Sequence, residues 1–400
     1  MLKASRAFKF TTLIIGILFF SLFLYFLNSS TRFTHNNQNS TSYVKYEKAK
    51  VLVVENESLK SYPNSTKIYL GTQQIKIKIL TGEHKGDIKT ITNFLSDTHN
   101  IYVNQGMKII VDVDTGNPNM YAVTVYNYYR APVQYVFILI FFVALCLIGG
   151  KKGVRSAIGI LISFILIFYM FLPIIYRGYS PILASILMVI ISSCVTLFLL
   201  NGWSAKTVSA ILGTILGVFV AGSIATLICN LAHLSGFNMA DVESLNMIST
   251  QSNMQVQWLL TAGILISSLG AVMDVSISIA SSVQEIYSLN PKLTEKELFK
   301  SGMNVGRDMM GTMVNTLILA FAGTSLSMFI VIYSYNLTNN QLFNMDMVNI
   351  VVLEGLTGSF AVILTVPIIA YISSQLIPDW IKNEKKKDIA SSEQVGIDLK

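Results

Sequence analysis

Residues 270–282 have the sequence Gly270-Ala271-Val272-Met273-Asp274-Val275-Ser276-Ile277-Ser278-Ile279-Ala280-Ser281-Ser282, in which one carboxylate interrupts an apolar run. A charged side chain at the centre of a bilayer costs about 2.5–3.5 kcal/mol on insertion scales. A membrane helix that keeps such a side chain usually turns it toward the bundle interior and uses it. We therefore predict a polar site buried among membrane helices, with Asp274 at its centre.

The composition of the whole chain places it in a lipid bilayer. Of its 400 residues, 52% are hydrophobic and only 13% are charged, whereas soluble domains carry about 25% charged residues. A membrane span needs about 20 mostly apolar residues. Eight segments meet that test: 8–27, 131–148, 154–176, 180–200, 207–231, 258–283, 311–333 and 348–373. The first could also be a signal peptide, but no small-x-small cleavage site follows it, which favours an uncleaved anchor.

The distribution of Lys and Arg predicts the orientation of the spans. These residues concentrate in segments that lie on one side of the membrane, while the opposite short loops hold only Arg177. The basic residues on the favoured side are Lys3, Arg6, Lys9, Lys151, Lys152, Arg155, Lys206, Lys292, Lys296, Lys300, Arg307, Lys382, Lys385, Lys386, Lys387 and Lys400. Both termini are therefore expected in the cytoplasm and residues 28–130 outside. Because the net charge of +7 is spread over loops, nucleic acid is not an expected partner.

The chain divides into four predicted parts: a membrane anchor at 1–30, an extracytoplasmic all-β domain at 43–130, a seven-helix membrane domain at 131–375 and a cytoplasmic tail at 376–400. Six short strands are expected in the β-domain, at 49–54, 67–70, 75–79, 87–92, 107–114 and 121–128, because apolar residues alternate there between turn clusters. They favour a small barrel or sandwich, and an OB-like barrel is one option. This domain either captures a substrate or partner or is a structural module at the outer mouth.

Helical spacing aligns the polar residues of the sixth span. Asp274, Ser278, Ser281 and Glu285 follow the spacing i, i+4, i+7, i+11, which places them on one helix face. At 1.5 Å per residue the stripe is about 16 Å long. We predict that Asp274, Ser278 and Ser281 line a pathway for an ion or solute.

The next helix repeats this spacing in Asn304, Asp308, Gly311 and Asn315. If the two helices turn their stripes toward each other, they enclose a hydrated cavity, with Asn304 and Asn315 as lining residues and Glu354 of the last span closing it. Carboxylate, hydroxyl and amide oxygens favour hard cations over soft metals. The alternative is that Asp274 is neutral and only links helices through a hydrogen bond to Ser278 or Asn315.

Three charged residues near the expected cytoplasmic edge, Glu285, Arg307 and Asp308, are predicted to form a gate or network. Arg307 could equally be a positive-inside residue alone. Two aspartates on consecutive helices, Asp274 and Asp308, also raise the hypothesis of an intramembrane aspartyl protease. That chemistry needs both acids to share one proton. We expect their depths to match poorly, and the family-type Gly-x-Gly-Asp is absent.

Other catalytic and cofactor-binding motifs are missing from the sequence. It has no phosphate-binding loop for ATP, no His-Glu-x-x-His and no nucleophile elbow. The three cysteines, Cys146, Cys194 and Cys229, all fall in predicted spans. The external domain has none, which excludes a disulfide framework there and argues against a cysteine-based metal site. We expect no enzyme activity, no cofactor, no metal site and no catalytic residue.

The same polar segments resemble the YibE/F family of bacterial multi-pass membrane proteins. The resemblance rests on residues 270–286 (GAVMDVSISIASSVQEI), Asn290-Pro291, residues 301–317 (SGMNVGRDMMGTMVNTL) and residues 353–359 (LEGLTGS). It implies the longer form of the family, with an external N-terminal domain, in the bacterial cytoplasmic membrane. It also implies a hetero-oligomer with the shorter form, which lacks that domain.

Two functional hypotheses follow. The first is a gradient-driven transporter or channel for a small solute or ion, with Asp274 in the pathway; any uphill transport would use an ion gradient, because no ATP motif is present. The second is a non-transporting membrane scaffold whose external β-domain docks an envelope or secreted partner.

Overall fold

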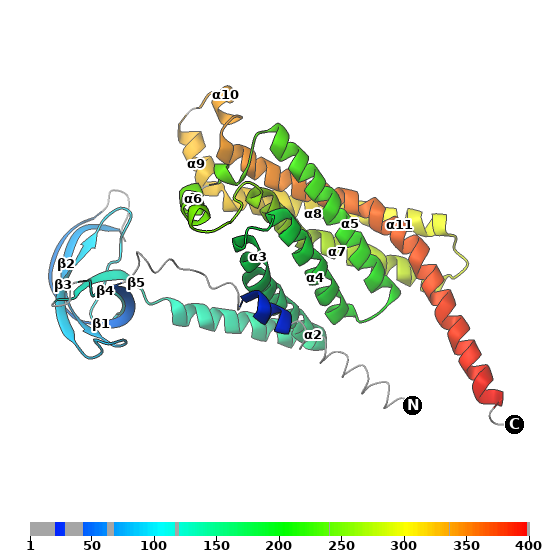
Figure 1. The fold of residues 1–400 in the computed structure, drawn as a ribbon, viewed down its shortest axis with the longest axis horizontal. Coiled ribbons are helices and arrows are strands. Elements are labelled where there is room, and N and C mark those ends of the chain that lie inside the picture. The colour runs from blue at the N-terminus through cyan, green and yellow to red at the C-terminus, as the bar shows by residue number, and fades with distance from the viewer. Residues whose placement is uncertain are drawn as a thin grey trace. The chain divides into compact units, whose positions relative to one another are not determined.

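The computed structural model describes residues 21–28, 43–61, 68–116, 120–239, 241–335 and 337–397. The chain separates into two compact units, one formed by residues 33–147 and one by residues 1–32 together with 148–400. Most of the predicted first span, 8–27, lies outside the described residues. The two units are taken in turn (Figure 1).

The first unit is an all-β domain of five antiparallel-paired strands in the order β3-β2-β1-β4-β5. Its strands are β1 (Val44–Ser61), β2 (Tyr69–Ile79), β3 (Ile88–Leu95), β4 (Lys108–Asp114) and β5 (Ala122–Tyr128). The edge strands β3 and β5 run parallel and their Cα atoms come within 8 Å, but no ladder joins them. This is the strand order of a partly open OB-type barrel.

Alternation along the strands builds the barrel core, as predicted. Ile75, Ile77 and Ile79 are fully buried, and the lysines between them are exposed. Six short strands were expected and five form, because the two segments at 67–70 and 75–79 belong to one strand, β2. Gly71 joins them with a φ of +134°, a conformation that only glycine adopts easily.

The second unit is helical and begins its described part with a helical segment at 21–28, whose Leu27 packs against Leu166 and Met170. The helix α2 (Ala131–Leu166), whose residues up to Leu147 belong to the first unit, continues through η1 (Ile167–Phe171) into α3 (Leu172–Tyr176). Gly150 interrupts it with a φ of +53°, at the boundary expected between two spans. The 46 residues from Ala131 to Tyr176 measure about 69 Å at 1.5 Å per residue, enough for two crossings of a layer about 30 Å thick.

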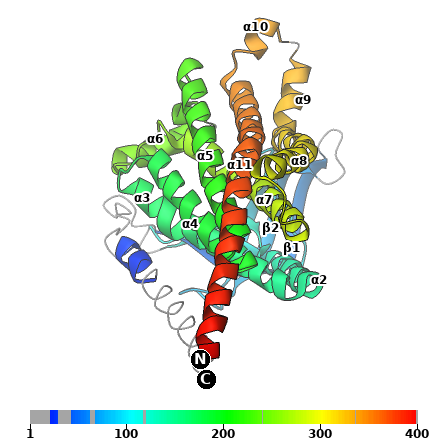
Figure 2. The same cartoon turned by 90° about the vertical axis from the view of Figure 1, so that its right-hand side faces the viewer.

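Four helices make the core of this unit: α4 (Pro181–Asn201), α5 (Ala205–Leu231), α7 (Leu259–Leu289) and α11 (Asp346–Ile397). Figures 1 and 2 show α11 lying along both α5 and α8. Glycines let α5 approach α11 closely: a Cβ on Gly213 would lie 2.6 Å from Ile369 Cδ1. Small residues spaced four apart on α5, Gly213 and Gly217, thus allow the tight packing of the two helices.

The remaining helices are α6 (Val242–Gln251), α8 (Glu295–Thr324), α9 (Leu326–Ser334) and α10 (Asn339–Leu342), with a short 3-10 turn, η2 (Gly236–Asn238). One span was predicted at 311–333, and in the structure this segment is divided between α8 and α9, which meet at 64°. The bend falls at Gly323-Thr324-Ser325, where residues of low helix propensity occur together. Thr324 Oγ1 donates to the carbonyl of Phe321 at 2.9 Å, a bond of the kind that bends helices.

These helices make the chain a polytopic membrane protein with an all-β domain. Within the described residues, five helices are long and apolar enough to cross a membrane, or six if the bent α8–α9 pair is one span. Eight spans were predicted. The difference arises because residues 131–176 form one broken helix, and because the predicted span 8–27 lies mostly outside the described residues.

Candidate functional site

The polar stripe of α7 exists as predicted, but it lies on the outer face of the bundle. The opposite face, with Val272, Ile279 and Val283, is fully buried in the core. Asp274 and Glu285 are exposed, and Ser278 and Ser281 are half-buried. The prediction that Asp274 is buried within the bundle is therefore wrong for this single chain. Its apolar face has packed instead, since desolvating aliphatic side chains is favourable and desolvating a carboxylate is costly.

The polar stripe of α8 also points away from the packed helices. Asn304, Asp308, Gly311 and Asn315 are all exposed, whereas Gly302 and Gly306 on the other face are buried. A Cβ on Gly306 would lie 3.0 Å from Ile279 Cδ1, and one on Gly302 would lie 3.1 Å from Val283 Cγ2.

The helices α7 and α8 thus meet through the faces opposite their stripes. The stripes do not enclose a cavity between the two helices, which corrects the expected arrangement.

Glu354 lies half-buried on α11, one turn from a point where three helices come together. There a Cβ on Gly358 would lie 3.7 Å from Leu317 of α8 and 4.0 Å from Ser268 of α7. In the part of the chain that the structure describes, the side chains of Asp274, Asn304, Asn315 and Glu354 form no hydrogen bond or ion pair. The alternative in which Asp274 links helices through Ser278 or Asn315 is therefore not seen within one chain.

The expected charged network is likewise not assembled within the chain. Glu285, Arg307 and Asp308 are all exposed, and among the described residues no ion pair joins them. Because Gly306 contacts Ile279 and the two helices run in opposite directions, Arg307 lies at the same height along the bundle as residue 278. Glu285 is seven residues further along α7, which is about 10 Å of helix rise.

The two aspartates lie at more similar depths than the sequence suggested. Relative to the Gly306–Ile279 contact, Asp308 lies two residues further along α8 and Asp274 lies five residues before Ile279 on α7. Because the two helices run in opposite directions, both aspartates lie on the same side of this contact. The difference is about 4.5 Å of rise, so the expectation of poorly matched depths is wrong. Both side chains nevertheless project from faces that point away from the contact, and no hydrogen bond between them is present in the described structure. An aspartyl dyad needs its carboxyls to share a proton at short range.

Sequence reasoning missed a second group of polar residues, which lies inside the bundle. Among the described residues, six buried side-chain hydroxyls have no hydrogen-bond partner, and they come from α4, α5, α7 and α11. They belong to Ser193, Thr196, Ser209, Thr214, Ser276 and Ser373. The available signal was the run Ser192-Ser193-Cys194-Val195-Thr196 in an apolar helix, which a search for charged residues passes over.

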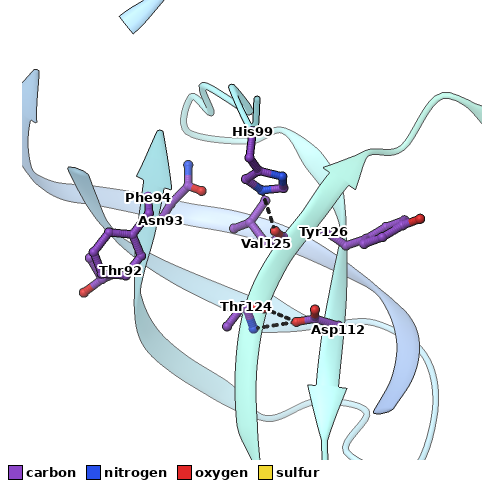
Figure 3. A pocket seen from close by; sticks show the side chains of 8 residues that line it. All are labelled: Thr92, Asn93, Phe94, His99, Asp112, Thr124, Val125 and Tyr126. Atoms are coloured by element: carbon purple, nitrogen blue, oxygen red, sulfur yellow. Dashed lines mark hydrogen bonds between the residues drawn. The ribbon is translucent and has the colours of Figure 1, made fainter. Parts of the chain in front are cut away.

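The β-domain has a cavity of about 230 Å³ at the open seam between β3 and β5 (Figure 3). Phe94 of β3 and Tyr126 of β5 are exposed on its two sides. His99 Nε2 lies 3.0 Å from the carbonyl oxygen of Val125. Asp112 accepts hydrogen bonds from the backbone amide and the hydroxyl of Thr124. The cavity joins aromatic and polar groups on an accessible face of the domain.

No group of three His, Cys, Asp or Glu side chains within the described ranges is arranged to hold a metal ion. Cys146, Cys194 and Cys229 are unpaired.

Comparison with known proteins identifies both parts of the chain. The family model described as "YibE/F-like protein" matches residues 137–379, and the model described as "YibE/F family N-terminal domain" matches residues 41–128. No curated protein and no solved structure matches the chain.

Proposed function

The chain belongs to the YibE/F family, and we propose that it is a gradient-driven membrane transporter or channel for a small solute or ion. The observation that carries the proposal is the exposed, unpartnered Asp274 on a membrane-length helix. A carboxylate facing lipid there would cost about 2.5–3.5 kcal/mol or more. Its retention is best explained by contact with water, an ion or a polar partner.

The proposed pathway runs along the outer polar face of α7 and α8. Asp274 is its central group, and Ser278, Ser281, Asn304, Asn315 and Glu354 line it. Since this face is open in one chain, a second chain is needed to close it from lipid. We propose the shorter form of the family as that chain, in a hetero-oligomer.

We further propose that the protein lies in the bacterial cytoplasmic membrane, with both termini inside and residues 28–130 outside. The support is the concentration of Lys and Arg in alternate loops. In this orientation the loop between α7 and α8 faces the cytoplasm. Glu285, Arg307 and Asp308 would then be near the inner mouth, where a partner chain could complete a gate.

Flux in sealed proteoliposomes tests the proposal. The full chain, alone and with its shorter relative, is given an imposed pH or sodium gradient with a pH-sensitive dye inside. We expect Asp274→Asn to abolish flux, because an amide cannot gain or lose the proton or bind a cation as a carboxylate does. Asp379→Asn, at an exposed acid of α11 outside both stripes, is the matched control and should keep it. Well-inserted wild-type protein that gives no flux in either form would refute the transporter.

The seam cavity of the β-domain favours a second candidate, the non-transporting scaffold. Here the cavity and its flanking Phe94 and Tyr126 would dock an envelope or secreted partner. Deleting residues 32–128 separates the two functions. A retained phenotype favours the membrane pathway, and a phenotype lost despite normal insertion favours the scaffold.

We do not propose catalysis. An intramembrane protease would require substrate cleavage that is lost with Asp274→Asn and with Asp308→Asn alike. The faces that these residues occupy would first have to turn toward each other.

A further inference from the structure

The six buried hydroxyls without partners differ from the other buried hydroxyls of the same helices. Five of those donate to a backbone carbonyl three or four residues earlier in their own helix: Ser185, Ser268, Ser359, Thr365 and Ser374. The six unpartnered hydroxyls make no such bond. A buried polar atom without a protein partner is rare in folded proteins, and binding of a water or an ion is one way in which such an atom is satisfied.

Three of the six lie at one level of the bundle, on three helices that contact one another: Ser193 of α4, Thr214 of α5 and Ser276 of α7. Each is fully buried, at 0% exposure. A short turn joins α4 to α5 between Asn201 and Ala205. Ser193 lies eight residues before that turn and Thr214 nine residues after it. Both are therefore about 12–14 Å from the turn.

The third hydroxyl is placed at the same level by a contact between α5 and α7. A Cβ on Gly217 would lie 3.2 Å from Val272 Cγ1. Since the helices run in opposite directions, Thr214 and Ser276 both lie toward the same end from this contact, by about 4.5 Å and 6 Å of rise. Ser193 is one turn from both Val189 and Leu197, which belong to the same core cluster as Val272.

The chemistry of these three hydroxyls restricts the class of ion that they can bind. The donors are neutral oxygens, and the carboxyl group of Asp274 on the same helix as Ser276 lies on the opposite face. Divalent cations are held mainly by carboxylates, and transition metals by nitrogen or sulfur ligands. A monovalent hard cation is instead compatible with hydroxyl and carbonyl oxygens alone, as in membrane sites built from neutral backbone and side-chain oxygens.

We propose that Ser193, Thr214 and Ser276 form a binding site for a small monovalent cation, with sodium as its ligand, in the core between α4, α5 and α7. The hydroxyl oxygens coordinate the ion, and backbone carbonyls of the same turns complete its shell. A role of this sodium ion in coupling rests on the proposed transport function. Binding of sodium at the site does not depend on that function.

Thermal unfolding of the purified full chain in sodium chloride and in choline chloride, at equal ionic strength, tests the site. Because a ligand that binds only the folded state stabilises it, we expect the midpoint to rise by roughly 2 °C at a sodium concentration ten times the Kd. Thr214→Val and Ser276→Ala should lose this shift. Ser268→Ala is the matched control, since that buried hydroxyl of α7 already donates to Leu265, and it should keep the shift.

Two outcomes would overturn the site: equal midpoints in the two salts, which would mean that the hydroxyls hold only water, or a sodium shift that persists in both variants. Thr214→Ser keeps the hydroxyl and should retain the shift. This variant therefore distinguishes loss of the hydroxyl from a general failure to fold. Equilibrium binding of radioactive sodium is the second measurement. Sodium stabilisation without flux would support the site and refute transport, whereas flux without sodium stabilisation would do the reverse.

Discussion

Replacing Gly71 by Ala should disrupt the barrel at the pairing of β1 with β2. Gly71 has a φ of +134°, and a Cβ there would lie 2.0 Å from the carbonyl oxygen of Ser58 on the neighbouring strand. Because that oxygen belongs to the backbone, it cannot rotate away. The strands would have to separate where Gly71 pairs with Leu59.

Two terms contribute to the destabilisation. The unfavourable backbone conformation costs about 1–3 kcal/mol, and forcing an extra methyl group into a filled space costs about 1–3 kcal/mol more. A substitution at Gly86 distinguishes the backbone term from the steric term, since Gly86 has a φ of +102° and nothing lies within 4 Å of a Cβ there. Gly86→Ala should therefore carry the first term alone, and the difference between the variants should be about 1–3 kcal/mol.

Hydrogen exchange of the full chain, read from the amides of β1 and β2, measures this difference. Each 1.4 kcal/mol corresponds to about tenfold in the opening equilibrium, so these amides should exchange several-fold to about a hundredfold faster in Gly71→Ala than in Gly86→Ala. Equal protection of β1 and β2 in the two variants would refute the close approach to Ser58 as the cause.

Two further predictions concern local features outside the proposed pathway. Burial and a hydrogen bond donated to Asp87 at 2.6 Å raise the pKa of Tyr121 to about 12; the neutral phenol is therefore favoured in the folded state, and its contribution to stability is present below pH 10 and lost as the pH rises through 12. Difference absorbance between wild type and Tyr121→Phe should show this tyrosinate forming near pH 12, and a midpoint near 10 would contradict the assignment. At the start of α8, Thr294 accepts from the Glu297 amide and Glu297 accepts from the Thr294 amide at 2.8 Å. Thr294→Ala should cost about 0.5–2 kcal/mol, seen as faster exchange in the first turn of α8, while Ser288→Ala, at an exposed hydroxyl near the end of α7, should leave that turn unchanged.

Local periodicity made much of the fold predictable. Runs of apolar residues marked the helices, and alternation marked the strands, because both patterns depend on neighbours a few residues apart. The spacing of Asp274, Ser278, Ser281 and Glu285 likewise fixed that they share a helix face. The break at Gly150 also fell where two spans were expected to separate.

The sequence by itself determined a membrane protein with polar-striped helices and a small β-domain, since hydropathy, alternation and helical spacing are properties of the chain alone. Tertiary packing decided which way the stripes point. The apolar faces of α7 and α8 met through Gly302 and Gly306, which left Asp274 and Asn315 on the outside. It also decided that Ser193, Thr214 and Ser276 are buried at one level, because their positions in three separate helices become related only when α4, α5 and α7 pack together.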